Sequence, residues 1–268
     1  MPQLVILPTP KWCVWSLTEE HGLRESKERV LLQKKLMELQ SEVRQLAAEH
    51  LQRQGYCVLE HAVSSEQRER ARSSLQPLLS HFQRCYDREE DEFKDIDPNR
   101  FGIVRFPRIG KGKHNLHFDP NGESEQHNVL AELASAAGLH QLLSISHDGK
   151  AVSLRETGVS MTAPNGGDGM EFHSDGPHGE NTMLMSLDED VTPQMGALLI
   201  VPGSHLWYVA GLGHAEGSID LALCDASKVA HLYRAGEPVL IDARLLHAVA
   251  PNVSSSWRVV AWFIFDTS

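Results

Sequence analysis

Glu-Phe-His-Ser-Asp at residues 171–175 places His173 and the carboxylate of Asp175 two positions apart. Alternate residues of a β-strand project to the same face, so these two side chains can converge on one ion. A third ligand must come from elsewhere, and His247 is the candidate because the apolar run at residues 237–242 before it indicates a strand. Two imidazoles and one carboxylate form the facial triad of non-haem iron(II) sites and leave three positions open.

The His-x-Asp pattern alone carries little weight in a chain with 15 His and 36 acidic residues. About two His-x-acid matches are expected by chance, and the chain has four, which begin at His117, His173, His178 and His214. The match at His173 differs from the others because an alternating segment at residues 157–162 precedes it and a probable strand at residues 181–187 follows it. We therefore interpret this match as part of a site.

A second pattern, His-x4-Asn-x-Ser-x3-Arg, is formed by His247, Asn252, Ser254 and Arg258. Upstream lie a Gly-Tyr-hydrophobic opening at residues 54–59, a helix start at residues 64–66 and a Gly-Ala-Leu…Pro-Gly-Ser-His segment at residues 196–205. With these elements in this order, the chain resembles the phytanoyl-CoA dioxygenase family, whose members use iron(II) and 2-oxoglutarate.

The resemblance implies that His173, Asp175 and His247 are the iron(II) ligands, with no catalytic residue beyond them. It also implies that Arg258 and Ser254 hold the distal carboxylate of 2-oxoglutarate, a role that suits the planar, permanently charged fork of arginine. The implied enzyme is an oxidoreductase that uses O2 to hydroxylate an aliphatic C–H bond of a small molecule. In the same reaction 2-oxoglutarate is decarboxylated to succinate and CO2.

The chain departs from the family pattern at a few positions. Phe172 stands where many relatives have Trp, and Met185 stands where many have an aromatic residue, so we expect Met185 in the wall of the 2-oxoglutarate pocket. Relatives also supply a basic or polar residue from an upstream strand. Arg105 or Arg108 is our candidate for that role and for substrate binding.

Residues 100–117 form the most basic stretch of an otherwise acidic chain. One interpretation is a patch that recognises an anionic substrate; the other is a solvated, Gly-rich loop, because charge runs usually are only solvated faces. The stretch contains Arg100, Arg105, Arg108, Lys111, Lys113, His114 and His117.

Composition indicates a single compact enzyme. The 268 residues, 41% of them hydrophobic, can bury a sizeable core. A formal net charge of −11 argues against a nucleic-acid partner. No segment has the roughly 18 consecutive apolar residues needed to span a membrane. Cys13, Cys57, Cys85 and Cys224 are widely spaced, which predicts reduced thiols in a cytoplasmic protein. We expect a monomer or a homodimer.

The chain divides into a helical front and a β-rich back. We expect residues 1–50 to be a largely helical N-terminal extension and residues 51–268 to be one iron/2-oxoglutarate dioxygenase domain. Residues 25–54 have a helical period and predict either a dimerising helix or, as we favour, a helix packed on its own barrel. Residues 64–67 form a capping box that opens a helix to about Phe82, residues 84–99 predict a solvated loop or lid, and residues 125–146 predict another helix.

From residue 151 onward, short segments separated by Gly, Pro, Asn and Asp predict antiparallel strands. The expected fold class is mainly β with flanking helices (α+β), with a double-stranded β-helix core, the cupin-like jelly roll. Such a barrel can hold one metal between strands that are far apart in sequence. We interpret residues 202–205 as a structural turn, so that His205 orders a loop and is not a ligand.

Two other functions remain open. One is a cupin-like metal-binding protein without 2-oxoglutarate chemistry, against which Arg258 and Ser254 argue. The other is a protein or peptide hydroxylase that uses the helical front as a docking surface.

Overall fold

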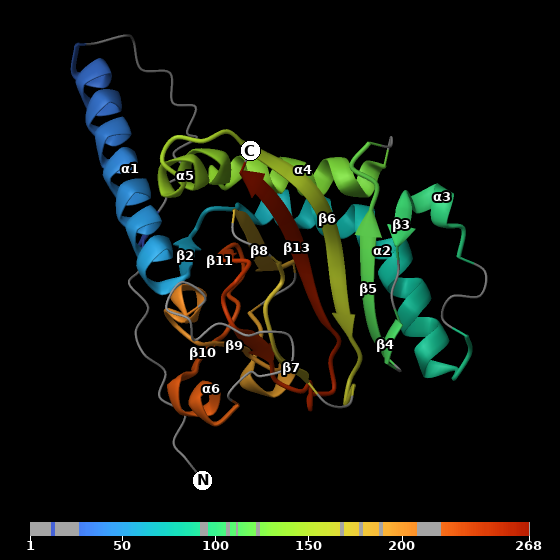
Figure 1. Ribbon diagram of the computed structural model, residues 1–268. Helices are drawn as coiled ribbons and strands as arrows, with labels where there is room; N and C mark the ends of the chain where they lie inside the picture. Colours follow the sequence, from blue (N-terminus) through green and yellow to red (C-terminus); the bar gives the residue numbers. More distant parts are fainter. Residues whose placement is uncertain are drawn as a thin grey trace.

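The computed structural model describes residues 12–13, 27–91, 96–105, 108–110, 112–121, 124–166, 169–176, 179–187, 190–207 and 221–267. Within these ranges the strands form two sheets (Figure 1). The larger has the order β1-β2-β11-β8-β13-β6-β5-β3, with β4 paired to β5, and the smaller has the order β10-β9-β12-β7. All neighbouring strands are antiparallel except the parallel pair β1 and β2.

The large sheet consists of β1 (Trp12–Cys13), β2 (Tyr56–Glu60), β3 (Ile103–Arg105), β4 (Arg108–Gly110), β5 (Lys113–Phe118), β6 (Val152–Thr162), β8 (Glu180–Ser186), β11 (Val239–Asp242) and β13 (Arg258–Thr267). The small sheet consists of β7 (Met170–His173), β9 (Leu198–Ile200), β10 (Val229–His231) and β12 (His247–Val249). From β6 onward the chain passes repeatedly from one sheet to the other, which is the connectivity of a jelly roll.

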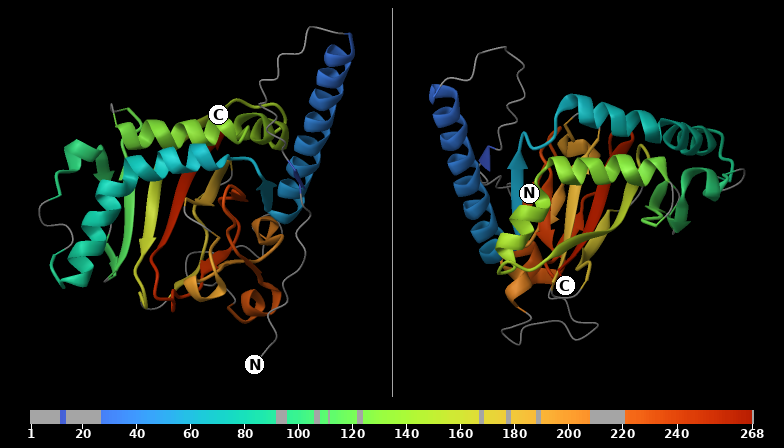
Figure 2. Two further views of the ribbon diagram at one scale, coloured as in Figure 1. Left: turned by 180° about the vertical axis from the view of Figure 1, so that it is seen from behind. Right: turned by 90° about the horizontal axis from the view of Figure 1, so that it is seen from above.

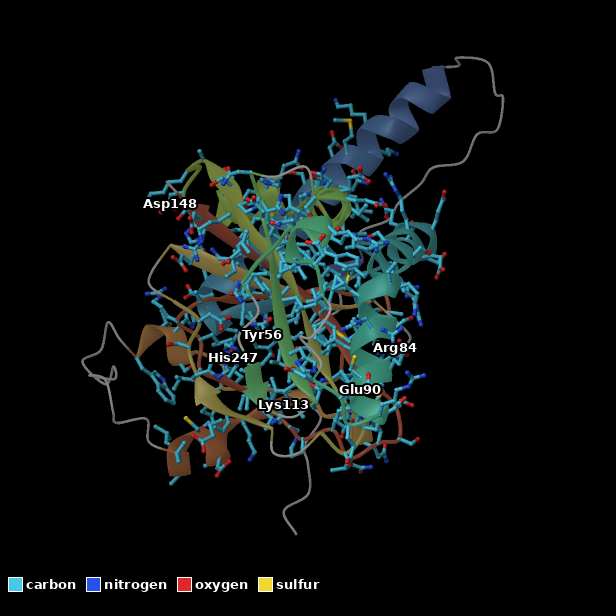
Figure 3. All side chains as sticks on the ribbon, turned by 90° about the vertical axis from the view of Figure 1, so that its right-hand side faces the viewer. Tyr56, Arg84, Glu90, Lys113, Asp148 and His247 are labelled. Carbon is cyan, nitrogen blue, oxygen red and sulfur yellow. The ribbon has the colours of Figure 1, made fainter. Side chains whose placement is uncertain are left out.

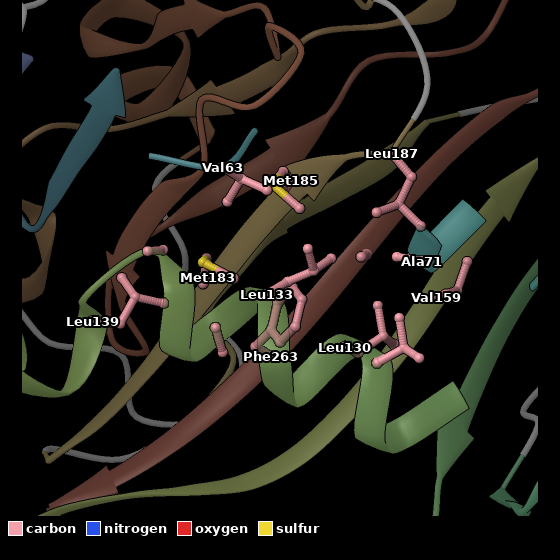
Figure 4. Packing of buried hydrophobic residues seen from close by; sticks show 14 of the residues in the cluster. Val63, Ala71, Leu130, Leu133, Leu139, Val159, Met183, Met185, Leu187 and Phe263 are labelled. Atoms are coloured by element: carbon pink, nitrogen blue, oxygen red, sulfur yellow. The ribbon is translucent and has the colours of Figure 1, made fainter. Parts of the chain in front are cut away.

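Helices cover one face of the large sheet. They are α2 (Ser65–Asp87), α4 (Glu125–Ala136) and α5 (Leu139–Ser146), which lie across the strands in Figure 2. The side chains between them form the main core, and Figure 4 shows Leu130, Leu133 and Phe263 packed there. Because helices bury one face of β13 and the second sheet buries the other, its sequence is apolar on both faces.

The alternation of side chains between the two faces of a strand decides which residues can reach the interior of the barrel. On β8, Met183 and Met185 are both 0% exposed and belong to the helix-packed core. Leu184, between them, projects to the opposite face and packs with the cluster between the sheets. The expectation that Met185 forms a wall of the 2-oxoglutarate pocket is therefore wrong, because a shift of one residue along a strand reverses the face.

The remaining helices are short except for α1 (Lys27–Gln54). They are α3 (Pro98–Phe101), α6 (Leu221–Ser227) and the 3₁₀ turns at Pro193–Met195 and Ser204–Leu206. Near its C-terminal end α1 buries Ala47, Ala48 and Leu51, whereas Met37 is 70% exposed and Leu39 is 51% exposed. The C-terminal part of α1 thus packs on its own barrel, as favoured above, and the rest extends beyond it (Figure 1).

Several sequence predictions need correction at element boundaries. The capping box opens α2 as expected, but the helix continues to Asp87, so the predicted loop from residue 84 is wrong at its start. The predicted helix at residues 125–146 is broken into α4 and α5 at Gly138, which has a φ of 67°. The basic stretch is not a plain loop, since it supplies β3, β4 and β5.

Among the described residues, no single helix is long and apolar enough to cross a membrane; only α4 and α5 taken together, across a bend of 61°, have the required length and composition.

Candidate metal centre and co-substrate pocket

Two adjacent strands of the small sheet bring the predicted triad together. His173 ends β7, Asp175 lies two residues further on, and His247 begins β12. His173 and His247 are direct cross-strand partners, so their side chains lie on the same face. Strand pairing therefore closes the long sequence separation between the His-x-Asp motif and the third residue.

The two imidazoles are oriented by the same local contact. His173 Nδ1 lies 2.8 Å from the carbonyl oxygen of Glu171, and His247 Nδ1 lies 3.0 Å from the carbonyl oxygen of Leu245. A carbonyl oxygen only accepts, so in both rings Nδ1 carries the hydrogen and donates it. Each Nε2 is then left with its lone pair, which is the form of imidazole that binds a metal.

The three ligand atoms are spaced as if around one ion. Asp175 Oδ1 lies 3.6 Å from His173 Nε2 and 3.5 Å from His247 Nε2, and all three atoms are within 4.8 Å of one another. These separations are long for hydrogen bonds. They fit two atoms that each lie about 2 Å from a shared transition-metal ion. The donor set therefore fits a divalent metal with open positions.

Burial keeps His247 in the neutral state that a metal requires. The residue is 4% exposed, and burial lowers the pKa of its imidazole, with His173 adding to the effect and Asp175 opposing it. The side chain of His173 is 34% exposed and that of Asp175 is 26% exposed. The triad thus has one buried member and two members that face the cavity.

Arg258, the first residue of β13, is held inside the same cavity. Its Nη1 donates to the carbonyl oxygens of Met195, Gly196 and Ala250 at 2.9, 3.0 and 3.3 Å, and its Nη2 donates to Thr162 Oγ1 at 3.1 Å. The residue is 8% exposed, and burial lowers the pKa of its guanidinium. Arginine nevertheless keeps its charge in proteins. The sequence-based expectation that this arginine points inward is confirmed.

The carbonyl contacts leave one edge of Arg258 available. Nε has no hydrogen-bond partner among the described residues, and Nη2, which has two hydrogens, has one partner, Thr162 Oγ1. Nε and Nη2 together form the side edge of the guanidinium. That edge matches the two oxygens of a carboxylate.

Ser254 lies in the turn that precedes β13. Its hydroxyl donates to Asn252 Oδ1 at 2.7 Å, and Asn252 Nδ2 in turn donates to the carbonyl oxygens of Thr162, Ala163 and Ser256. Asn252 lines the cavity, whereas Ser254 is not among its lining residues. The hydroxyl of Ser254 therefore braces the turn, and its contact with a co-substrate stays a prediction.

The cavity between the sheets has a volume of about 210 Å³ and includes the triad and Arg258 in its lining. Lys113 of β5 and Tyr233, between β10 and β11, also line it. Lys113 Nζ donates to the carbonyl oxygen of Gly169 at 3.0 Å. Burial raises the pKa of the Tyr233 phenol, so this hydroxyl stays protonated and can donate a hydrogen bond.

Among the described residues, Lys113 of β5 is a lysine of the upstream strands that reaches the cavity. The sequence places it in the basic stretch but does not single it out for this role. Lys113 and His247 appear in the same lower part of the barrel in Figure 3. The register Lys113–Thr162–Arg258 across β5, β6 and β13 places Lys113 in one row with Arg258. Arg105 lies on β3 and Arg108 on β4, but their side chains lie outside the described part of the structure.

His205 has the structural role expected of it. It is 2% exposed, and its Nε2 lies 2.9 Å from the carbonyl oxygen of Gln52. The residue thus links the 3₁₀ turn to the end of α1 and lies outside the triad.

A family model described as Phytanoyl-CoA dioxygenase (PhyH) matches residues 51–260. No curated protein sequence is a significant match to this chain.

Several solved structures share the fold. AviO1 from Streptomyces viridochromogenes Tue57 is 21% identical, with a TM-score of 0.61 over 83% of this chain and 94% of that chain. SnoN, titled a non-heme alpha ketoglutarate dependent epimerase from nogalamycin biosynthesis, is 18% identical, with a TM-score of 0.61 over 85% of this chain and 84% of that one. EctD from S. alaskensis, crystallised with 2-oxoglutarate and 5-hydroxyectoine, is 22% identical, with a TM-score of 0.59 over 82% of this chain and 74% of that chain. The predicted jelly-roll core with flanking helices is confirmed.

Proposed function

Because the chain belongs to the phytanoyl-CoA dioxygenase family, whose model it matches over residues 51–260, we propose that it is an iron(II)- and 2-oxoglutarate-dependent dioxygenase that hydroxylates an aliphatic C–H bond of a small molecule. The observation that carries the proposal is the placement of a His-Asp-His triad and a buried arginine with a free carboxylate-binding edge in one cavity.

His173, Asp175 and His247 would hold the metal. Bound iron(II) would supply the activation of O2 that couples decarboxylation of 2-oxoglutarate to succinate and CO2 with insertion of oxygen into the C–H bond. Asp175 offsets one of the two positive charges of the ion, so an anionic chelator remains electrostatically favoured at the open positions. The neutral rings of both histidines complete the set without adding charge.

Arg258 would bind the distal carboxylate of 2-oxoglutarate through Nε and Nη2. The three carbonyl contacts to Nη1 fix the guanidinium plane before the co-substrate arrives, so little conformational entropy is lost on binding. Lys113 adds a second positive charge to the same row of the sheet. Ser254 remains in our proposal as a neighbour of this carboxylate, placed through its bond to Asn252.

Hydroxylation is our choice among the outcomes that this chemistry allows. Two of the similar structures are titled an epimerase and a carbocyclase, so the fold does not decide the outcome. Asp175 favours hydroxylation over halogenation, because halogenating relatives replace this carboxylate by a small residue.

Succinate release from the purified full-length chain tests the central claim. We expect turnover of 2-oxoglutarate that requires added Fe(II) and O2 and is stimulated by small organic compounds. Binding of metal without binding or turnover of 2-oxoglutarate would instead support a cupin-like protein without this chemistry. Stimulation by peptides alone would support the protein or peptide hydroxylase.

We further propose a cytoplasmic enzyme in which residues 1–50 extend a single domain at residues 51–268. Cys57, Cys85 and Cys224 are buried, and none of them forms a disulfide with another, which supports a reducing compartment. A monomer or a homodimer is compatible with this arrangement.

A further inference from the structure

The inner face of the large sheet carries a second polar group, on the side of the cavity away from Arg258. Register places His117 of β5 and Trp262 of β13 in one row, with Gly158 of β6 between them. Asn115 and Ser160 form the next row toward Arg258. All four side chains line the cavity that contains the triad.

Trp262 reaches across β6 to fix the orientation of Asn115. Gly158 permits the crossing, since a Cβ there would collide with the Trp262 ring and with the carbonyl oxygen of Leu116. Trp262 Nε1 donates to Asn115 Oδ1 at 2.6 Å, and Ser160 Oγ donates to the same oxygen at 3.2 Å. An indole N–H only donates, so the atom it meets is the amide oxygen. The amino group of Asn115 is left on the cavity wall with no partner among the described residues.

Two further polar groups line the same cavity, His117 beside Asn115 on β5 and Thr182 across the sheet on β8. His117 Nδ1 lies 2.8 Å from Glu156 Oε1, and its ring meets Trp262 edge to face at 4.6 Å. A carboxylate accepts, so Nδ1 carries the hydrogen and donates it, and Nε2 is the ring nitrogen left for a ligand. Thr182 is 4% exposed and lines the cavity, and within the described ranges its buried Oγ1 has no hydrogen-bond partner. A buried polar group without a partner is costly, which indicates that a ligand or water completes it.

The charges of the two ends of the inner face are opposite. Lys113 and Arg258 provide positive charge at the end that would take 2-oxoglutarate. At the other end, Glu180 and Asp266 share one cation, Arg155, at 2.6 and 3.1 Å, and Glu156 adds a third carboxylate. These carboxylates lie beyond the cavity lining but outnumber Arg155 beside them, so their net negative charge disfavours an anionic substrate group at this end more than a neutral polar group.

We propose that Asn115 and His117 form the substrate-recognition subsite of this cavity, and that it takes a small molecule with an apolar body and a neutral hydroxyl or carboxamide group. Such a group accepts from the amino group of Asn115 and hydrogen-bonds to Nε2 of His117, while the apolar body packs on Trp262, Leu184 and Ile264. The inference rests on the proposed function, since it assigns the substrate side of the same cavity. It also favours a neutral substrate over the anionic one, which was one of two interpretations of the basic stretch.

A set of cyclohexane derivatives tests this specificity. Cyclohexanol, cyclohexanecarboxamide, cyclohexanecarboxylate and cyclohexylammonium share one body and differ in the polar group. Binding is measured by saturation-transfer NMR on the full chain loaded with 2-oxoglutarate and with Zn(II) as a diamagnetic substitute for iron. We expect the alcohol and the carboxamide to bind at least about tenfold more tightly than the carboxylate, a difference of about 1.4 kcal/mol. A carboxylate that binds as tightly, or an alcohol without detectable binding, overturns the proposal.

Asn115→Asp isolates the donor group. The variant keeps the oxygen that Trp262 and Ser160 contact, but it replaces the amino group by a second acceptor. We expect about tenfold weaker binding of cyclohexanol and cyclohexanecarboxamide and tighter binding of cyclohexylammonium. Asn128→Asp, at an exposed position on α4 outside the cavity, is the matched control and should leave all four affinities unchanged. An Asn115→Asp protein with the wild-type profile contradicts the subsite.

Binding of 2-oxoglutarate is followed in the same samples to separate the two claims. If 2-oxoglutarate fails to bind the metal-loaded chain, the proposed function fails. If it binds while the four probes show no preference, only the subsite is wrong.

Discussion

At the scale of single residues, Asp175 is the one anionic ligand of the candidate metal centre. The two imidazoles are neutral donors oriented by the carbonyl groups of Glu171 and Leu245, so neither supplies negative charge to a divalent ion. Asp175 is also the member whose oxygen lies at nearly equal distances from both Nε2 atoms. Removal of this carboxylate should therefore reduce iron affinity more than removal of a group that only orients a ligand.

We expect Asp175→Ala to lose iron affinity by more than about 100-fold, because changes to outer-shell partners alone typically cost about 10–100-fold. The measurements are bound iron after gel filtration and succinate release. Asp225→Ala removes a carboxylate of α6 that is 62% exposed and paired with Lys228, and this variant should bind iron and release succinate as the wild type does. An Asp175→Ala protein that keeps iron and couples 2-oxoglutarate turnover to hydroxylation would disprove the ligand assignment.

Arg258→Lys tests the carboxylate edge. Lysine keeps the charge but cannot contact three carbonyl groups and a carboxylate at once. We expect the KM for 2-oxoglutarate to rise at least about tenfold, and the free energy of unfolding to fall by about 1–3 kcal/mol because buried carbonyl oxygens lose their donor. Arg155→Lys, at a side chain that is 42% exposed, is the matched control. A loss of stability with an unchanged KM would assign Arg258 a structural role only.

At the scale of elements, the sequence could predict what depends on local period and spacing. The spacing of two residues keeps Asp175 next to His173 even though β7 ends at His173, and the capping box of α2 lies within four residues. Lys113, Asn115 and Trp262 could not be predicted as one cavity wall. Their proximity depends on the register of β5, β6 and β13, which tertiary packing selects.

The predicted helix boundaries are wrong for a related reason. Arg84 and Asp87 belong to α2, but charged residues on an exposed helical face resemble those of a solvated loop. Gly138 separates α4 from α5, although the apolar period of the sequence continues on both sides of it. Met185 was assigned to the wrong face because the expectation came from a resemblance and not from the phase of its own strand.

The start of α2 provides a prediction on stability. Ser64 Oγ accepts from the backbone N–H of Gln67 at 3.2 Å, and Gln67 Oε1 accepts from the backbone N–H of Ser64 at 2.9 Å. Ser64→Ala leaves the first of these donors without its partner, so we expect the free energy of unfolding to fall by about 1 kcal/mol. Ser73→Ala, at an exposed site inside the same helix, should lower the free energy of unfolding by a smaller amount in the same urea titration. Equal losses for the two variants would show that the cap contributes nothing.

At the scale of the whole molecule, the inner face of the large sheet carries opposite charges at its two ends, with the positive groups in the cavity lining. The large sheet supplies both ends: Lys113 and Arg258 in one row, and the carboxylates of Glu156, Glu180 and Asp266 at the other end. The small sheet supplies the triad between them. An anionic co-substrate and a neutral substrate can therefore approach one metal from different sides without competing for the same groups.

Buried imidazoles make the stability of the whole fold depend on pH. Burial is the main cause that lowers the pKa of His50, His127, His205, His231 and His247 below the ordinary value of 6.5, and it lowers that of His231 to about 4. Between these values the unfolded chain binds protons that the folded chain does not, so acid favours unfolding. The stability from these groups is complete above pH 6.5 and is lost as the pH falls from 6.5 toward 4.

We therefore expect the free energy of unfolding of the metal-free chain to decrease by a few kcal/mol, on the order set by linkage, between pH 6.5 and pH 4. Urea titrations at intervals across this range measure the decrease. His231→Phe removes one of the groups, and its ring position beside Tyr233, 5.7 Å between centroids, can accept another aromatic side chain. The free energy of unfolding of the His231→Phe variant should decrease less steeply than that of the wild type as the pH falls. A wild-type stability that is constant or rises as the pH falls from 6.5 to 4 would contradict neutral, buried imidazoles in the native state.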